Sequence, residues 1–493
     1  MYSLGGDVMA VKWDEITDVL IIGSGFAGLA AAIEAANAGA SVVVLEKMKA
    51  AGGNSIISDG GIAAAGTDMQ KKRGISDPPG QMYDDMLRAG LGINHPKLVR
   101  QVTERSNEVL RWTIDYLGVE YMDRLDIFGG HSVSRCLTPV GVSGKTIIRQ
   151  QLKKLREMGI TVRTGAFFTA FITDDKGEIT GVLIREGYKY NQPDSGIEKR
   201  IGIRRGIVLA TGGFGSDVEF RTTQDPRLTR DIDTTNKPFA TAEALKEALK
   251  IKAMPVHLSH IQLGPWGTPD EKGYGAGARF SDYIVFPYGL VIDPGSGKRI
   301  VNELADRKTV SDAILAAGHP CIGIADKKAV ETTGWDITPC LEKGIIGSFN
   351  NFRELASHYG IPPDELVHSV EQYNRFVRDK VDLEFGKQVL PDASPVSNPP
   401  FLGIRTWPKV HHTMGGVQID ENARVIDINQ QPIPRLYAAG EVTGGIHGAC
   451  RLGSCAVTEC LVFGRIAGQN AAAEVIFSPD SLTREEKRSQ ITK

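Results

Sequence analysis

The pattern of apolar and polar positions near the N-terminus predicts a strand, a helix and a second strand. Residues 18–22 form a short apolar run after their first position, as expected of a strand buried on both faces of a sheet. The alanine-rich segment from Leu29 to Asn37 predicts a helix that Gly39 ends. Residues 41–45 repeat the buried-strand pattern and close on Glu46. The segment therefore predicts a complete βαβ unit.

The rest of the chain also consists of predicted helices and buried strands, except for one region of mixed elements. Helical patterns cover residues 79–117, 145–158 and 456–474, and strand patterns cover residues 161–173, 180–186, 206–210 and 436–440. Between Ala253 and Lys409 the elements are mixed and proline is frequent. We therefore expect an α/β fold. A split dinucleotide-binding domain of the two-dinucleotide, Rossmann-like type covers residues 1–252 and 410–477. An α+β capping domain, residues 253–409, is inserted into it, and a polar tail, residues 478–493, follows.

A glycine-rich turn links the first predicted strand to its helix. Gly23, Gly25 and Gly28 have the spacing G-x-G-x-x-G, in which the first glycine makes the turn, the second admits a pyrophosphate and the third lets helix and strand pack closely. The helix N-terminus favours the phosphate charge. Glu46 lies where an acid binds ribose hydroxyls and disfavours a 2′-phosphate. This context favours a dinucleotide site over a turn without function.

Composition and charge narrow the classes of function. The formal net charge of −2 gives no overall field for nucleic acid. The six cysteines are dispersed, and the five-residue spacing of Cys450, Cys455 and Cys460 scatters them around a helix, so we expect no metal site. Residues 1–17 are polar and no apolar run reaches the ~20 residues that span a bilayer. We expect a cytoplasmic protein without membrane contact.

Several longer motifs carry a resemblance to a known family. The most specific are Gly52-Gly-Asn-Ser55, residues 411–417 (HHTMGGV) and residues 440–448 (GEVTGGIHG) leading into Arg451-Leu-Gly453. With these motifs the chain, from Asp18 to about Ala473, resembles the flavoprotein subunits of fumarate reductases and succinate dehydrogenases. It is most similar to soluble fumarate reductases related to flavocytochrome c, beside urocanate and other enoate reductases.

The resemblance implies FAD, bound non-covalently, as the cofactor. It implies a set of FAD-binding residues drawn from the glycine-rich loops and from the starts of two helices. They are Gly23, Gly25, Phe26, Ala27, Gly28, Glu46, Lys47, Gly53, Asn54, Ser55, Gly60, Gly61, Ala210, Thr211, Gly212, Gly440, Glu441, Arg451, Ser454, Ala456 and Val457. No second G-x-G-x-x-G follows a strand, so we expect electrons from an external donor, a redox protein or a reduced cofactor.

The resemblance also implies catalytic residues for reduction of an activated carbon–carbon double bond, with a small enoate as substrate. Arg307, which follows Asn-Glu as in the family, matches the proton donor, and Asp282 or Asp306 can return the proton to it. His411 and Arg451 match the residues that bind the substrate carboxylate. We expect His412 to pack against its neighbours or to orient them. For His447, a structural role fits as well as a functional one.

Departures from the family indicate a different substrate. Gly264 stands where fumarate reductases have a histidine, Ser281 and Asp282 align with a Thr-Glu pair, and Val285 aligns with an arginine that grips a second carboxylate. Aromatic residues lie around them, Trp266, Tyr283, Phe286 and Tyr288. Because an unpaired buried charge is costly, we expect a monocarboxylate with an apolar or aryl tail rather than fumarate. His260 and Arg279 are the nearby side chains that could bind a second carboxylate in place of that arginine.

Three alternatives remain open from the sequence. A 3-oxosteroid dehydrogenase of similar fold polarises a ketone with tyrosine, for which Tyr283 and Tyr288 are candidates. A fumarate reductase proper is the second. A non-catalytic electron-transfer flavoprotein subunit is the third, and the presence of Arg307 argues against it.

Overall fold

The first apolar run forms the central strand of the largest sheet. In the computed structural model, which describes residues 11–479, β1 (Glu15–Ile22) lies between β2 (Val42–Glu46) and β8 (Ile197–Leu209) and runs parallel to both. The strand order is β17-β18-β8-β1-β2-β5. The other strands of this order are β17 (Arg424–Ile426), β18 (Pro432–Ala438) and β5 (Val162–Thr164). An antiparallel hairpin, β6 (Ala166–Thr173) and β7 (Ile179–Glu186), joins the sheet through β8.

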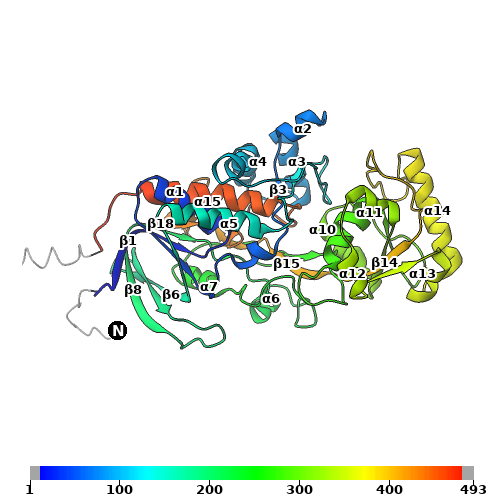
Figure 1. The fold of residues 1–493 in the computed structure, drawn as a ribbon. Coiled ribbons are helices and arrows are strands. Elements are labelled where there is room, and N and C mark those ends of the chain that lie inside the picture. Colours follow the sequence, from blue (N-terminus) through cyan, green and yellow to red (C-terminus); the bar gives the residue numbers. More distant parts are fainter. Residues whose placement is uncertain (1–10, 480–493) are drawn as a thin grey trace, which may run out of the picture.

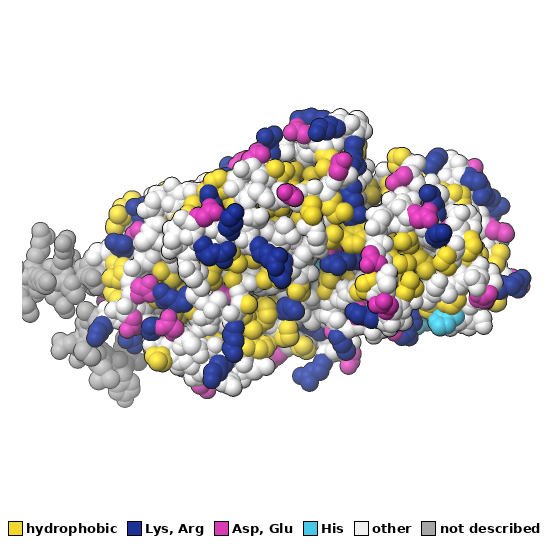
Figure 2. Space-filling view, viewed as in Figure 1, with side chains coloured by type: hydrophobic (Ala, Val, Ile, Leu, Met, Phe, Trp, Pro, Cys, Tyr) yellow, Lys and Arg dark blue, Asp and Glu magenta, His cyan; other side chains and the backbone are white. Residues whose placement is uncertain are grey.

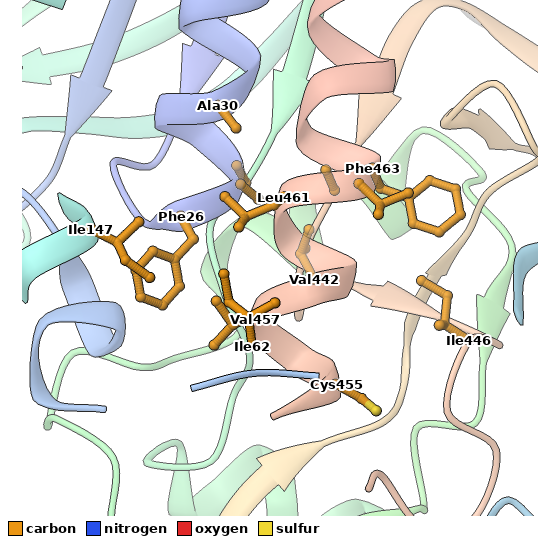
Figure 3. Packing of buried hydrophobic residues seen from close by; sticks show 14 of the residues in the cluster. Phe26, Ala30, Ile62, Ile147, Val442, Ile446, Cys455, Val457, Leu461 and Phe463 are labelled. Carbon is orange, nitrogen blue, oxygen red and sulfur yellow. The ribbon is translucent and has the colours of Figure 1, made fainter. Parts of the chain in front are cut away.

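Three helices lie along this sheet (Figure 1). α1 (Phe26–Asn37) packs between α15 (Cys455–Ala473) and α5 (Gly144–Glu157). Gly464 and Gly468 of α15 lie so close to the backbone of α1, at Ala27 and Ala31, that no side chain fits there. Figure 3 shows this packing, with Leu461 and Val457 of α15 beside Phe26 of α1. The close approach fixes the N-termini of both helices, which face the same region.

A second body of structure lies at the other end of the molecule (Figure 1). Its antiparallel sheet has the order β11-β12-β14-β13, and helices α10 to α14 cover it. The strands are β11 (Leu290–Ile292), β12 (Cys321–Asp326), β13 (Ile346–Phe349) and β14 (Phe401–Thr406). The helices are α10 (Arg307–Ala317), α11 (Lys327–Thr333), α12 (Thr338–Glu342), α13 (Phe352–Tyr359) and α14 (Pro363–Asp379). The predicted α/β fold with an inserted capping domain is confirmed, while the bounds at 253 and 409 stay a prediction.

Further strands and helices lie outside these two sheets. The strands among them pair as β10 (Ile261–Gly264) with β15 (Lys409–Thr413), β16 (Gly416–Gln418) with β9 (Pro255–Val256) and β19 (Thr443–Gly444), and β3 (Ile62–Ala63) with β4 (Cys136–Leu137). The helical segments are η1 (Gly53–Ile57), α2 (Asp68–Lys72), α3 (Pro79–Ala89), α4 (Pro96–Arg111), η2 (Trp112–Tyr116), α6 (Val218–Gln224), α7 (Glu243–Lys250), α8 (Gly277–Phe280), η3 (Ser281–Val285) and α9 (Phe286–Tyr288).

Several elements differ from their predicted bounds for local reasons. The helix predicted over 79–117 is interrupted between Gly90 and His95, and the strand predicted over 161–173 breaks at Gly165, whose φ is +66°. α1 begins at Phe26, three residues earlier than predicted, so that Gly25 is its N-cap. β8 begins at Ile197 because its first half pairs with the β7 hairpin.

The surface mixes both signs of charge. Lys and Arg side chains are interspersed with Asp and Glu over the face drawn in Figure 2. Among residues 11–479, no helix is long and apolar enough to cross a membrane. Residues 1–10 of the polar N-terminal segment, and the predicted tail from residue 480 onward, lie outside the described residues.

Candidate active site

Two adjoining cavities lie where the large sheet, the glycine-rich loops and the capping region meet. The first, the dinucleotide cavity, follows the carboxyl ends of β1, β2 and β8. The second, the arginine cavity, contains Arg307, His411 and Arg451. The two share five lining residues, Phe26, Asn54, Ser55, Glu441 and Cys460. They form one elongated space, as a dinucleotide with a reactive ring at one end requires.

The three glycines of the first turn serve different purposes. A side chain on Gly23 would overlap the carbonyl of Ala210, and one on Gly28 would overlap the carbonyl of Gly23. The chain itself therefore requires these two glycines. Gly25 has an ordinary φ of −74°, and an added Cβ would come no closer than 3.1 Å, to Ser55 Oγ. Because the protein does not exclude a side chain at Gly25, a ligand against the helix N-terminus explains its absence, and this fits the pyrophosphate of FAD.

Glu46 ties the two glycine-rich loops together. One carboxylate oxygen accepts a hydrogen bond from Ser24 Oγ at 2.5 Å, and the other accepts the backbone N–H of Met48 at 2.9 Å. Ser24 Oγ in turn accepts the N–H of Gly52 at 2.9 Å. Glu46 lines the cavity at the end of β2, where the sequence predicts the ribose. The network fixes both loops before any ligand arrives.

Side chains and helix ends shape the junction of the two cavities. Ser55 Oγ accepts the N–H of Phe26 at 3.1 Å, and Asn54 donates to Asn236 Oδ1 at 2.6 Å. α15 begins at Cys455, directly after the lining residue Ser454. Its N-terminus therefore faces the arginine cavity, where a helix dipole favours negative charge on a reduced flavin.

Nearly all of the predicted FAD-binding residues line this space. The exception is Gly28, which packs helix against strand. Lys47 lines the dinucleotide cavity, and its ammonium contacts Thr241 at 2.8 Å and Glu243 at 3.2 Å. Sequence reasoning missed lining residues that no local motif marks, namely Phe167, Phe168, Phe239, Thr241 and Glu243 in the dinucleotide cavity and Phe128, Thr235, Asn236 and Tyr274 in the arginine cavity.

Arg307 and Asp282 meet in the arginine cavity. Arg307 is the first residue of α10 and Asp282 lies in η3, and Arg307 Nη2 is 3.3 Å from Asp282 Oδ2. Arg307 Nη1 is buried without a hydrogen-bond partner. Burial raises the pKa of Asp282 to about 6, against the opposing charge of Arg307. Such a carboxyl exchanges its proton near neutral pH, which suits a proton carrier.

His411 and Arg451 lie in the same cavity. His411 Nδ1 is 2.8 Å from the hydroxyl of Thr235, and its ring is edge-on to Trp266 at 4.7 Å between centroids. Burial, with Arg451 and Arg307 nearby, holds the pKa of His411 well below its usual value. Burial lowers the pKa of Arg451 to about 10, and Arg451 Nε is buried without a partner. Two arginines with unpaired nitrogens and a neutral histidine form an anion site.

The neighbouring histidines are also buried. His412 lies 3.5 Å from Glu441 Oε1 and lines the arginine cavity with His411. Burial and Arg451 lower the pKa of both His412 and His447. Both ring nitrogens of His447 lack a partner, and His447 does not line the cavity. Asp306, the second predicted relay residue, caps α10 by accepting the N–H groups of Lys308 and Thr309, and it does not line the cavity either.

The aromatic side of the cavity differs from the one expected. Trp266 and Tyr283 line it, but Val285, Phe286 and Tyr288 do not. Val285 turns toward Gly323 of β12, 3.1 Å from the position of an added Cβ, because the helical turn directs it to the capping core. A side chain on Gly264 would lie 2.8 Å from the Trp266 ring. Trp266 therefore occupies the space of a residue-264 side chain, and His260 lies outside the cavity.

No group of three or more His, Cys, Asp or Glu residues within 11–479 is arranged to hold a metal ion. Cys455 is fully buried beside the N-terminus of α15, whereas Cys460 lines both cavities.

Comparisons with known proteins agree with this geometry. The FAD binding domain family matches residues 18–457. The acrylate reductase flavoprotein subunit of Shewanella woodyi is 44% identical over 93% of this chain and 92% of its own length. The fumarate reductase (cytochrome) of Shewanella frigidimarina is 34% identical over 93% of this chain and 77% of its own. Among solved structures, the open conformation of a flavocytochrome c3 fumarate reductase has a TM-score of 0.72 and 31% identity, covering 94% of this chain and 79% of the other. The chain belongs to the fumarate reductase and succinate dehydrogenase flavoprotein family and is an FAD-dependent oxidoreductase that acts on CH–CH groups.

Proposed function

We propose that this enzyme reduces the carbon–carbon double bond of a 2-enoate that carries one carboxylate and an apolar or aryl tail. The supporting observation is the supply of free donors in the arginine cavity. Arg307 Nη1 and Arg451 Nε are buried and unpaired, which suits one carboxylate and the charge that develops on it. The similarity to an acrylate reductase flavoprotein subunit supports a small monocarboxylate.

The residues divide the chemistry among them. Arg451 and His411 bind the carboxylate, and the Thr235 hydroxyl can donate to His411 Nδ1 so that Nε2–H faces the ligand. Arg307, whose guanidinium also lies over the Trp266 ring at 5.7 Å, holds the proton for the substrate carbon. Asp282 returns a proton to Arg307. The bound FAD supplies the hydride. Val285 has no part in this arrangement.

The cofactor and its electrons complete the proposal. We propose that FAD binds non-covalently, held by the glycine backbone, Glu46 and the two helix N-termini that line the cavities. The electrons come from an external redox protein or reduced cofactor, and the similarity to a flavoprotein subunit supports this view. A cytoplasmic location stays a prediction from the sequence.

The alternatives have weaker support. A steroid ketone needs a tyrosine hydroxyl that donates into the cavity, but Tyr283 and Tyr274 both donate to Asp59, and Tyr288 lies outside. A non-catalytic electron-transfer subunit gives no reason to bury Arg307 against Asp282 without full pairing, which is costly. A fumarate reductase proper needs a group that binds the second carboxylate of its substrate, and Val285, which aligns with that group, does not line the cavity.

The test is anaerobic stopped-flow reoxidation of the reduced enzyme by acrylate, methacrylate, cinnamate and fumarate at equal concentrations. We expect at least one monocarboxylate to reoxidise the flavin roughly 10-fold or more faster than fumarate, because fumarate leaves one charge unpaired. Propionate and succinate, which lack the double bond, are the controls and should leave the flavin reduced. Faster reoxidation by fumarate than by every monocarboxylate would refute the proposal, and so would preferential turnover of a 3-oxosteroid.

A further inference from the structure

One of the protein's own carboxylates in the arginine cavity, that of Asp59, is bonded as a ligand carboxylate would be. Asp59 lines the cavity, and its side chain is only 11% exposed. Arg279 donates to Asp59 Oδ1 from Nε at 3.0 Å and from Nη2 at 2.9 Å. The hydroxyls of Tyr274 and Tyr283 donate to Oδ2 at 2.8 and 3.2 Å. Four donor groups thus converge on one side chain.

This donor set is the kind that binds a ligand carboxylate. The guanidinium of Arg279 contacts one carboxylate oxygen and the two phenols donate to the other, so both oxygens are bonded. Burial and the charge of Asp59 hold the pKa of Tyr274 and Tyr283 well above the usual range, so both keep the proton they donate. Each hydroxyl has one proton, which is given to Asp59, and Arg279 Nη2 also donates to Val142 O at 3.1 Å. Neither tyrosine keeps a proton to donate to a ligand, and two of the three guanidinium nitrogens of Arg279 are engaged.

The cluster and the anion site lie in one cavity, and Trp266 contacts a residue of each. Trp266 contacts His411 at 4.7 Å and Tyr274 at 5.3 Å between ring centroids. Asp59 also contributes to the electrostatic environment of Asp282, which pairs with Arg307. Tyr274, Tyr283 and Asp59 are therefore available to the part of a substrate that extends beyond Arg451 and His411 in this cavity.

We propose that Asp59 is a specificity determinant that occupies the place of a substrate's second carboxylate. This inference rests on the proposed function. A dicarboxylate entering the cavity meets the like charge of Asp59 and finds Arg279 and both tyrosines already engaged. A monocarboxylate brings no second charge, and its tail meets Trp266 and the tyrosine rings instead. The enzyme thus rejects fumarate for two reasons. The charge of Asp59 repels the second carboxylate, and the groups that could bind that carboxylate are already engaged.

The experiment removes the internal carboxylate. In the FAD-loaded Asp59→Ala variant, Arg279, Tyr274 and Tyr283 become free, and we expect the ratio of the fumarate to the acrylate reoxidation rate to rise roughly 10-fold or more over the parent. Succinate should perturb the oxidised flavin spectrum of Asp59→Ala at concentrations that leave the parent unchanged. Asp59→Asn keeps the volume and one acceptor oxygen, so its gain should be smaller.

A double variant shows whether the gain comes from binding of the second carboxylate by Arg279 or from a general loosening of the cavity. If Arg279 grips the new carboxylate, Asp59→Ala/Arg279→Gln loses the increase that Asp59→Ala shows. A variant that holds FAD and reduces acrylate without any rise in the fumarate ratio overturns the inference and leaves the proposed function standing. A parent enzyme that prefers fumarate refutes the proposed function itself. If Asp59→Ala does not hold FAD, Asp59→Ser carries the same prediction, and failure of both variants to hold FAD makes Asp59 structural and overturns the inference.

Discussion

The dinucleotide cavity and the arginine cavity are built in contrasting ways. Glycine and alanine, which leave the backbone open to a ligand, line much of the first, on turns at the carboxyl ends of parallel strands and at the N-terminus of α1. Charged and aromatic side chains make most of the second, and they come from segments as far apart as Asp59, Tyr274, Arg307 and Arg451. A site made of backbone keeps its ligand through large sequence changes, whereas a site made of side chains changes its ligand by substitution.

The two cavities also differ in how well their polar groups are satisfied. Both oxygens of Glu46 in the dinucleotide cavity have partners within the chain. In the arginine cavity, Arg307 and Arg451 each keep an unpaired buried nitrogen, and burial raises the pKa of Asp282 and lowers that of Arg451. Unpaired buried groups cost stability, and catalytic sites commonly retain them because the substrate supplies the missing partner.

The largest effect expected from this contrast is at Gly25. Gly25→Val should fold, since an added Cβ meets only Ser55 Oγ, at 3.1 Å, but its side chain blocks the approach of the pyrophosphate to α1. We expect loss of FAD, measured as the flavin absorbance per chain after purification, with far-ultraviolet circular dichroism unchanged.

Gly80→Val is the matched control, because Gly80 has open space around it and lies away from both cavities. It should keep its FAD. Isolation of Gly25→Val with full FAD content would place the pyrophosphate elsewhere and remove the main support for a backbone-built cofactor site.

The next effect concerns the side-chain-built cavity. Arg307→Ala should retain FAD and lose turnover by roughly 10²–10⁴-fold, since a positioned acid contributes about that much. The measurements are steady-state enoate reduction with a reduced dye and the flavin content of the same sample.

Lys308→Ala is the control on the same helix. Lys308 is about half exposed and pairs with Asp312 on the surface, so the variant should keep activity near that of the parent. If Arg307→Ala turned over within a few-fold of the parent, Arg307 would not be the proton donor, and the unpaired nitrogen in the cavity would need another explanation.

The same contrast explains what could be predicted from the sequence. Gly23, Gly25 and Gly28 lie within six residues of one another, so their spacing is visible in the sequence and indicates the turn and the cofactor together. Arg307 and His411 were found only through the family resemblance. Asp59 was missed although it directly precedes Gly60 and Gly61, because its partners Tyr274 and Arg279 are more than 200 residues away in sequence. Val285 was expected in the cavity because an alignment does not give the direction of a side chain on a helical turn.

The smallest effect expected is a change in how stability depends on pH. The folded-state pKa of Asp282, about 6, lies above its ordinary value of 3.8, because burial disfavours the charged form. Between these pH values the folded protein holds a proton that the unfolded chain releases, so the free energy of unfolding falls as pH rises through this window. Asp282→Asn has no such proton and should not show this fall.

The variant is therefore expected to gain stability relative to the parent from pH 4 to pH 6, by at most about 1.4 kcal/mol per pH unit, and to show no further gain above pH 6. Urea unfolding of FAD-loaded protein at pH 4, 5, 6 and 7 measures the difference at each pH. The same variant should turn over more slowly, because asparagine cannot return a proton to Arg307. A stability difference that does not change with pH would mean that Asp282 titrates alike in the folded and unfolded chain. The burial of Asp282 would then cost no stability, and the two cavities would not differ in this respect.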